Sequence, residues 1–551
     1  MKQKFSFLGL ILILAAFFRL YQLNQVPIEL FGDELDIGYQ AYSILKTGKD
    51  LRGYSWPIYF HSLSEFRAPL YLYATVPFVA LFGLNEWGVR LPAAFFGILN
   101  LFLLYLLVKK FLKSEILALI STFLLAVTPW HIHYGRAGFE VTLLLTLILG
   151  GLFFWLKAKY LISTLFFLLA FYTYSTAVLF IFLLLPILFF LDKTWRKVGK
   201  RVFLTAFSVF LVGTIPFVFG LFSGQAGERF SQISIFNDQK LVERIINKRG
   251  GEFPFGRFFH NKATEIGKEF VSNYLNAFSP DFLFLRGDPN PRHSVGTMGE
   301  LYLIYLPFLI FGLVEVAKNL EKKENLFLLG WLLVSPVPSA LTIGGGNHAT
   351  RLFLMLPVLV VFIAIGVAQS WFWIKRMPNI FKFLLVIFTF LLFIFNFISY
   401  FHQYYVHYPK ESWQFWHYGY KEAIQYLAVI DENYDRIILN NSHEPILIRL
   451  LFWAKKDPVW FHRNFVDDQE RPNVLPDFTG FRVDKYYFGH FQKPEELGKI
   501  LDKKTLYLAF QKEEIPGGWD WSKNPPAEIK VLKLIKNPLG DPYIYLLTKK
   551  D

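Results

Sequence analysis

Residues 352–368 read LFLMLPVLVVFIAIGVA, an apolar run without a charged side chain. A helix needs about 17–25 mostly apolar residues to cross a bilayer, so this run predicts a membrane-spanning helix. Similar runs recur along the first 400 residues of the chain. The clear ones are 5–20, 91–108, 116–129, 141–156, 161–172, 178–191, 202–222, 301–316, 326–343, 352–368 and 380–399.

The composition agrees with a membrane protein. Of the 551 residues, 54% are hydrophobic and 18% are charged, whereas soluble domains are about 45–50% apolar and about 25% charged. The aromatic share of 19% excludes a disordered chain, because so much apolar surface does not stay solvated. The chain has no cysteine, which excludes disulfides, thiolate zinc sites and cysteine nucleophiles.

Lysine and arginine orient the chain, since short cytoplasmic loops are enriched in them. Placing all the dense basic clusters inside gives a consistent membrane topology of about eleven crossings. The N-terminus is then inside, and everything after residue 400 is outside. The net charge of +14 is then largely topological, and we expect no nucleic-acid partner. These clusters lie at 2–4, 109–113, 157–159, 193–201, 318–323 and 375–376.

One apolar segment, 69–84, does not fit this topology. Counting it as a crossing would move every later basic cluster to the outside, so we interpret it as a short interfacial or re-entrant element. Alternatively it crosses, and a short run such as 161–172 does not.

We expect two domains. Residues 1–400 form a transmembrane catalytic domain with outside loops at 21–69 and 223–298. Residues 401–551 form a small extracytoplasmic α/β domain, because short strand-like runs alternate there with Pro and Gly punctuation. The expected strands are 436–439, 486–488, 505–510, 529–535 and 543–547, with a helix at 445–454.

Acidic residues collect in the outside segments. Asp33 and Glu34 stand in the first outside loop, and Glu65 lies near the end of the same loop. Such a pair is also compatible with a solvated loop or with a helix N-terminus, whose dipole favours negative charge. Glu140 directly precedes an apolar run, and an acid at a membrane edge is a functional-site hypothesis.

Cationic residues collect on the same side. The candidates for binding a phosphate are Arg67, Arg136, Arg292, His293, His348 and Arg351. Three glycines precede His348, and glycines let a backbone approach a ligand closely. His131 and His133 could be metal ligands, although their spacing alone is weak support.

A site with both kinds of charge can take a proton from a hydroxyl and stabilise a departing phosphate. Outside the membrane, activated sugars are carried on lipid-linked phosphates. The pattern therefore favours transfer of a sugar from a polyprenyl-phosphate donor. The competing class is a transporter or flippase of lipid-linked sugars, but the apolar runs carry few of the charges that transport pathways need.

The order of these motifs resembles the GT-C glycosyltransferases of the family 39/83 type, which include protein O-mannosyltransferases and the lipid A aminoarabinose transferases. The resemblance covers roughly residues 1–400. It rests on Asp33-Glu34 after the first helix, on Glu65-Phe66-Arg67-Ala68-Pro69-Leu70, and on Arg136-Ala137-Gly138-Phe139-Glu140.

The resemblance implies an inverting transferase with a GT-C fold in which Asp33 is the catalytic base, with Glu34 beside it and Glu140 as the second acid. Glu65 and Arg67 are similar to a Glu-Lys pair of the lipid A transferases, in which a glutamate of that loop can help bind a divalent metal. The acceptor could be a glycan, a lipid or a protein. A related oligosaccharide ligase would use a diphosphate-linked donor instead.

Overall fold

A computed structural model describes residues 2–63, 65–197, 199–249, 256–465, 475, 478–491, 497–511, 519–525 and 527–550. Within these ranges, four helices are long and apolar enough to cross a membrane, and six further apolar helices are shorter. This pattern indicates a membrane protein, while the count of about eleven crossings stays a prediction. The four long spans are Glu86–Phe111, Lys200–Phe222, Ala349–Ile374 and Asn379–Glu411.

The chain divides into two compact units. The helical unit comprises Met1–Tyr21, Leu63–Tyr71 and Leu91–Tyr404. The sheet unit comprises Gln22–Ser62, Leu72–Arg90 and Tyr405–Asp551. Most of the predicted first outside loop, Gln22–Ser62, therefore belongs to the same unit as the C-terminal strands. The predicted division at residue 400 stays a prediction.

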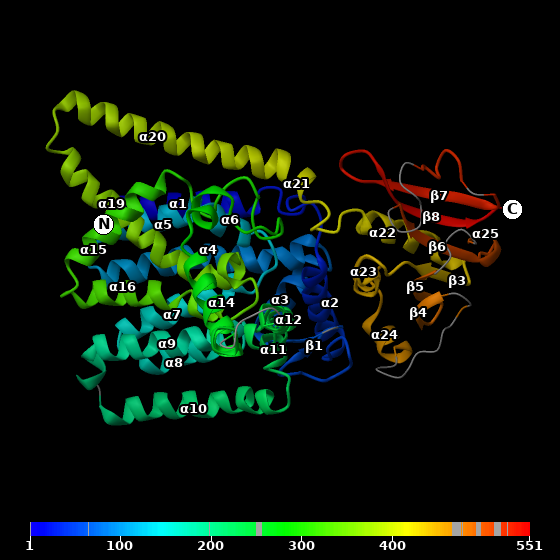
Figure 1. The fold of residues 1–551 in the computed structure, drawn as a ribbon, viewed down its shortest axis with the longest axis horizontal. Coiled ribbons are helices and arrows are strands. Elements are labelled where there is room, and N and C mark those ends of the chain that lie inside the picture. The colour runs from blue at the N-terminus through cyan, green and yellow to red at the C-terminus, as the bar shows by residue number, and fades with distance from the viewer. Residues whose placement is uncertain are drawn as a thin grey trace. The chain divides into compact units, whose positions relative to one another are not determined.

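The helical unit is built from the apolar runs of the sequence (Figure 1). Most of its helices begin and end within a few residues of the predicted runs. Its main helices are α1 (Lys2–Leu20), α4 (Glu86–Phe111), α5 (Glu115–Val127), α6 (Pro129–Tyr134), α7 (Val141–Leu156), α8 (Tyr160–Phe171), α9 (Ser175–Leu191), α10 (Lys200–Phe222), α15 (Tyr305–Lys318), α16 (Lys323–Val334), α19 (Leu356–Ile374) and α20 (Asn379–His402).

The predicted outside segments of this unit, together with the end of the apolar run 326–343, carry short elements. They are β2 (Phe66–Arg67), α11 (Glu228–Ile233), α12 (Gln239–Arg249), α13 (Gly256–Phe259), α14 (Lys262–Asn276), a π-helical turn at Asp281–Leu285, α17 (Val337–Ala340) and α18 (Ala349–Leu352). The predicted run 326–343 is broken between α16 and α17, because Pro336 cannot donate a backbone hydrogen bond.

Packing differs among the helices. α19 is largely buried and lies against α15, where Gly312 and Gly366 let the two backbones approach closely. α10 and α20 instead expose most of their apolar side chains and form outer edges of the unit (Figure 1). Exposed apolar surface of this extent is expected where lipid, rather than water, surrounds a helix.

The sheet unit contains a six-stranded mixed sheet in the order β4-β5-β3-β6-β8-β7. β3 runs parallel to both β5 and β6, and the remaining pairs are antiparallel. Five of these strands were predicted, whereas β4 was not. The strands are β3 (Arg436–Leu439), β4 (Phe478–Val483), β5 (Tyr486–Phe491), β6 (Thr505–Phe510), β7 (Ile529–Lys536) and β8 (Pro542–Lys549).

Helices complete the sheet unit. α2 packs on α23, and Gly38 permits that contact, because a Cβ there would lie 2.5 Å from the Phe452 ring. The other elements are β1 (Phe60–His61), most of α3, and helices from the C-terminal part. The helices are α2 (Gly32–Thr47), α3 (Pro69–Phe82), α21 (Tyr408–Glu411), α22 (Tyr420–Ile430), α23 (Ile446–Trp453), α24 (Pro458–Asn464) and α25 (Leu497–Ile500).

The segment 69–84, which did not fit the predicted topology, forms α3, a helix of 14 residues. Fourteen residues rise about 21 Å, which is less than the roughly 30 Å of a bilayer core. The interpretation as a short interfacial or re-entrant element is therefore compatible with its length and stays a prediction.

Candidate functional site

Asp33 and Glu34 lie in the first turn of α2 rather than in a loop. Of the alternatives that the sequence left open for this pair, the helix N-terminus is the one observed. Both acids lie where the unpaired backbone N–H groups and the helix dipole favour negative charge. The Asp33 side chain is half-buried, whereas that of Glu34 is fully buried.

Glu34 has a specific partner in the same unit, Arg90. The Arg90 guanidinium donates to both carboxylate oxygens of Glu34, at 3.0 and 3.2 Å. Its remaining N–H groups donate to the carbonyl oxygens of residues 23, 27 and 29 at 2.7–3.0 Å. All five donors of the guanidinium are thereby used. Glu34 is a buried, neutralised carboxylate that fixes the start of α2.

In the helical unit, Glu65 is held between two arginines. One carboxylate oxygen lies 3.2 Å from Arg67, and the other pairs with Arg229 at the start of α11. The Phe66 N–H donates to the Glu228 carboxylate at 3.1 Å, which ties β2 to α11. Because both oxygens of Glu65 face guanidinium groups, they do not fit the metal-binding role that the resemblance implies for this residue.

A second polar cluster in this unit combines Asp288, His293 and His348. One ligand atom from each side chain lies within 4.8 Å of the others. Asp288 Oδ2 is 3.8 Å from His348 Nδ1 and accepts the Ala349 N–H at 2.8 Å. The two imidazole rings are 4.9 Å apart between centroids. The structure thus joins the loop at 288–293 to the loop that precedes α18.

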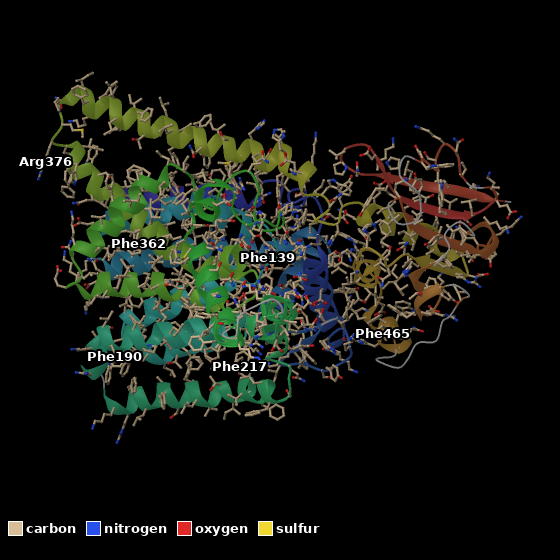
Figure 2. The ribbon with its side chains drawn as sticks, in the orientation of Figure 1. Phe139, Phe190, Phe217, Phe362, Arg376 and Phe465 are labelled. Atoms are coloured by element: carbon tan, nitrogen blue, oxygen red, sulfur yellow. The ribbon has the colours of Figure 1, made fainter. Side chains whose placement is uncertain are left out.

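Two hydroxyl groups lie within hydrogen-bond distance of His293. Its Nδ1 atom lies 3.1 Å from the Tyr134 hydroxyl and 3.2 Å from the Thr350 hydroxyl, which are themselves 2.6 Å apart. Phe139 covers the ring, with centroids 5.3 Å apart. Figure 2 shows Phe139 among the crowded interior side chains, whereas Arg376 lies exposed at the turn after α19. His293 is therefore held in one orientation.

Burial controls the protonation of this cluster. Burial raises the pKa of Asp288 to about 6, and backbone N–H groups limit that rise. Burial and then the positive charges of Arg351 and Arg229 lower the pKa of His348 to about 3. Burial, followed by the neighbouring His348 and Arg292, also lowers the pKa of His293 well below its usual value. Both imidazoles are consequently neutral at physiological pH.

Arg351 and Arg292 flank the cluster in different ways. Arg351 donates to the Thr342 hydroxyl at 2.7 Å and to the Ile343 carbonyl at 3.0 Å. The Arg292 carbonyl accepts from His133 Nε2 at 2.8 Å, which anchors its loop to α6. Both arginine side chains are half-buried.

The glycines before His348 have a packing role. A Cβ at Gly345 would lie 1.8 Å from the Ser339 carbonyl oxygen, and one at Gly346 would lie 2.8 Å from Asn276. These glycines let the chain pack closely on α17 and α14, rather than only on a ligand as the sequence suggested.

Four further residues that the sequence singled out are buried more deeply or contact other elements. Arg136 is fully buried, donates to the Phe18 carbonyl at 2.8 Å and covers the Tyr404 ring. Glu140 is half-buried at the N-cap position of α7, next to Phe139. His131 lies 2.5 Å from Arg19, while His133 turns to the Arg292 loop, so these two histidines contact different elements.

The two clusters of the helical unit act on each other electrostatically. The positive charge of Arg229, the partner of Glu65, acts on both His348 and Arg351. Arginines 229 and 351 therefore lie within electrostatic range of each other and of the neutral His348. Such a surplus of donors and positive charge suits a multiply charged anion. Arg286, by contrast, is 78% exposed and pairs with Asp281.

Sequence reasoning did not single out Asp288, Tyr134 or Arg229 as site residues. The usable signal was the run Asp288–Pro289–Asn290–Pro291–Arg292–His293, in which two prolines stiffen a loop that carries an acid and a base.

Comparison with solved structures gives a full-length match. ArnT from Cupriavidus metallidurans, solved with undecaprenyl phosphate, is similar over 98% of this chain and 97% of its own, with a TM-score of 0.52 and 12% identity. The chain has a GT-C type fold. At this identity the likeness concerns the fold alone. In sequence, residues 66–219 match the protein family described as Dolichyl-phosphate-mannose-protein mannosyltransferase.

The chain is also similar to the oligosaccharyltransferase of Archaeoglobus fulgidus, solved with a tethered acceptor peptide. That match has 14% identity and a TM-score of 0.49, and it covers 82% of this chain. The chain spans slightly less than two thirds of the length of that enzyme, at 63%. No curated protein sequence matches the chain.

Proposed function

We propose that this GT-C protein is a glycosyltransferase that moves a sugar from a polyprenyl-phosphate donor to an acceptor hydroxyl. The reaction takes place at the outer face of the cytoplasmic membrane, and the acceptor belongs to a glycan, a lipid or a protein. The observation that carries the proposal is the group of Arg229, Arg351, His293 and His348 in the outside segments of the helical unit.

This group has the chemistry of a phosphate site. Arginine presents a planar fork of donors that matches phosphate oxygens, and hydrogen bonds to charged groups are about twice as strong as neutral ones. The donors sit on short elements and loops rather than in the middle of apolar helices. A phosphate at the head of a membrane lipid would meet them at the membrane edge.

Two comparisons support the same donor class. The family matched by residues 66–219 is described by its use of dolichyl-phosphate-mannose. The ArnT structure that shares the fold is described as bound to undecaprenyl phosphate. Both names refer to phosphates carried on polyprenyl chains, which is why we infer this class of donor here.

The proposed reaction is a single displacement. The acceptor oxygen forms a bond to the anomeric carbon of the sugar while the bond from that carbon to the phosphate oxygen breaks. The hydroxyl proton passes to Asp33, and the electron pair leaves on the lipid phosphate. One displacement inverts the anomeric centre. Arg351, Arg229, Arg67 and Arg292 then neutralise the charge of the departing phosphate.

Asp33 and Glu34 have different roles in the proposed reaction. The Glu34 carboxylate is fully buried and occupied by Arg90, so it positions α2 and does not accept a proton from substrate. Asp33 is half-buried in the same helical turn, so its carboxylate is the one of the pair that a substrate can reach. Glu140 remains our candidate for a second acid.

The test of the base is Asp33→Asn, which keeps the size of the side chain but removes its basicity. General bases contribute roughly 10²–10⁴-fold, so we expect transfer from a polyprenyl-phosphate sugar to fall by that factor. Asp435→Asn is the matched control, because Asp435 is exposed in the sheet unit and should leave turnover unchanged.

The assay uses the purified full chain in detergent. Detergent solution has no two sides, so product formation there distinguishes transfer from flipping of the donor. An Asp33→Asn protein with normal turnover would rule out the assigned base. A wild-type protein that never consumes the donor, but moves it across vesicle membranes, would rule out the proposed function.

A further inference from the structure

The strongest unassigned feature is the cluster of Asp288, His293 and His348. From this geometry we propose that these three side chains bind a divalent transition-metal ion of the zinc type. The inference rests on the proposed function, because the ion would face the same phosphate as the surrounding arginines. It assigns a metal ion to the three side chains, whereas Arg229 and Arg351 are assigned to the phosphate.

The donor set is suited to such an ion. One carboxylate and two imidazoles are ligands that zinc accepts, and three protein ligands with one open position are typical of zinc sites that act on a substrate.

The geometry is close to what coordination needs. The ligand atoms lie within 4.8 Å of one another, and the Asp288 to His348 pair is 3.8 Å apart. Two ligands on one tetrahedral zinc are about 3.4 Å apart when each bond is about 2.0–2.1 Å. The widest separation exceeds this spacing by at most about 1.4 Å, so the ligand atoms need to close by no more than that distance to complete the site.

The surroundings orient two of the ligands. His293 Nδ1 faces the hydroxyls of Tyr134 and Thr350, an outer-shell contact that leaves Nε2 for an ion. In the described part of the chain, Nδ1 of His348 has no hydrogen-bond partner. The carboxylate of Asp288 is fixed by the N–H groups of Asn290 and Ala349 at 2.9 and 2.8 Å.

The nearby charges predict how the fourth position is filled. Arg229 and Arg351 act on His348 through their positive charge, so a bare cation is opposed there. A phosphate oxygen as fourth ligand offsets this repulsion, because the phosphate binds the ion and the arginines together. The ion should therefore bind more tightly when a lipid phosphate is present.

The experiment is equilibrium dialysis of the purified full chain against Zn²⁺, with and without farnesyl phosphate, followed by metal counting by mass spectrometry. We expect one Zn²⁺ per chain in the presence of the lipid phosphate. His348→Ala should weaken Zn²⁺ binding at least about 100-fold, since even an outer-shell change costs 10–100-fold. His490→Ala is the control, because His490 is exposed on β5.

A second measurement does not depend on the folding of a variant. Co²⁺ bound to the wild-type chain should give the intense visible absorption of a four-coordinate site, and His293→Gln should change that spectrum. The proposal is overturned if wild type binds no Zn²⁺ in either condition. It is equally overturned if His348→Ala and His293→Gln retain the wild-type Zn²⁺ count.

These outcomes are separable from failure of the proposed function. Asp33→Asn should keep the Zn²⁺ count while losing transfer. Transfer that persists unchanged after the wild-type chain is shown to bind no Zn²⁺ would leave the glycosyltransferase proposal standing without its metal. Zn²⁺ binding at the cluster in a chain that never consumes a sugar donor would retain the metal site and overturn the transferase.

Discussion

The two units of the chain bury their charged groups in different ways. In the sheet unit, two buried acids are fully matched: Glu34 has Arg90, and the Glu29 carboxyl group accepts the N–H groups of Gly419 and Lys421 at 2.7 Å each. In the helical unit, Arg351 and Arg229 repel each other, and both positive charges act on the neutral His348.

The difference separates charges that serve the fold from charges that serve a ligand. A fully matched buried ion pair leaves nothing for a substrate, and removing one partner is costly. A cluster with surplus donors and like charges is poorly satisfied by the protein alone, so it gains most when an anion arrives. Three variants test this separation, starting with the largest expected effect.

The largest effect is expected for Arg90→Ala, which tests whether the matched ion pair of the sheet unit serves the fold. This variant leaves the buried Glu34 carboxylate without its guanidinium and should lower the free energy of unfolding by about 3–5 kcal/mol. The measurement is denaturant or thermal unfolding of the full chain in detergent. Arg463→Ala, at an exposed position of the same unit, should change stability by less than about 0.5 kcal/mol. Equal stability of the two variants would contradict the structural role of Arg90.

Arg351→Ala tests the opposite behaviour. It should leave the fold intact but weaken donor binding by about 1.5–3 kcal/mol, or roughly 10- to 100-fold, because one hydrogen bond to a charged group is lost. Titration with a polyprenyl phosphate measures the affinity. Arg286→Ala is the control, since Arg286 is mostly exposed and pairs with Asp281. Unchanged affinity in Arg351→Ala would remove this arginine from the phosphate site.

The smallest effect concerns pH. Burial raises the pKa of Glu29 to about 8, well above the ordinary value of 4.5, although the N–H groups of Lys421 and Gly419 oppose the rise. The folded chain therefore binds this proton more tightly than the unfolded chain, and the stabilisation is lost as pH rises from about 5 to about 8. Glu29→Gln should abolish this component.

The measurement is the melting temperature of the full chain at pH 5 and pH 8.5. Wild type should lose about 2–4 °C more than Glu29→Gln between these values. Glu432→Gln, at an exposed position after α22, should follow the wild-type curve. Parallel curves for all three proteins would contradict the pKa assigned to Glu29.

Much of the fold could be predicted from local pattern. The apolar runs at 141–156 and 202–222 coincide with α7 and α10 within two residues, and 505–510 is β6. Local pattern failed where a boundary depends on packing. α2 begins at Gly32, and Arg90 supplies the partner that lets Glu34 be buried in the first turn of this helix. β4 was missed because its residues alternate weakly and include Gly480.

The sequence predicted the chemistry of the candidate site but not all of the residues that form it. The excess of Arg and His in the outside segments pointed to a phosphate. The sequence contained no sign that Asp288 meets His348, 60 positions further along the chain, because that contact depends on how two loops fold over the helices. Arg136 was expected among the phosphate ligands, yet its full burial against Phe18 and Tyr404 is visible only in three dimensions.

The shared carboxylate of Glu65 has a consequence for turnover. Arg67 and Arg229 already hold an anion before any lipid arrives, so an incoming phosphate must exchange with Glu65 rather than simply add to an open site. The same exchange runs backwards after the sugar has left: the carboxylate competes with the spent lipid phosphate for both guanidinium groups. In the proposed reaction cycle, Glu65 therefore limits how tightly the product is retained and speeds its departure.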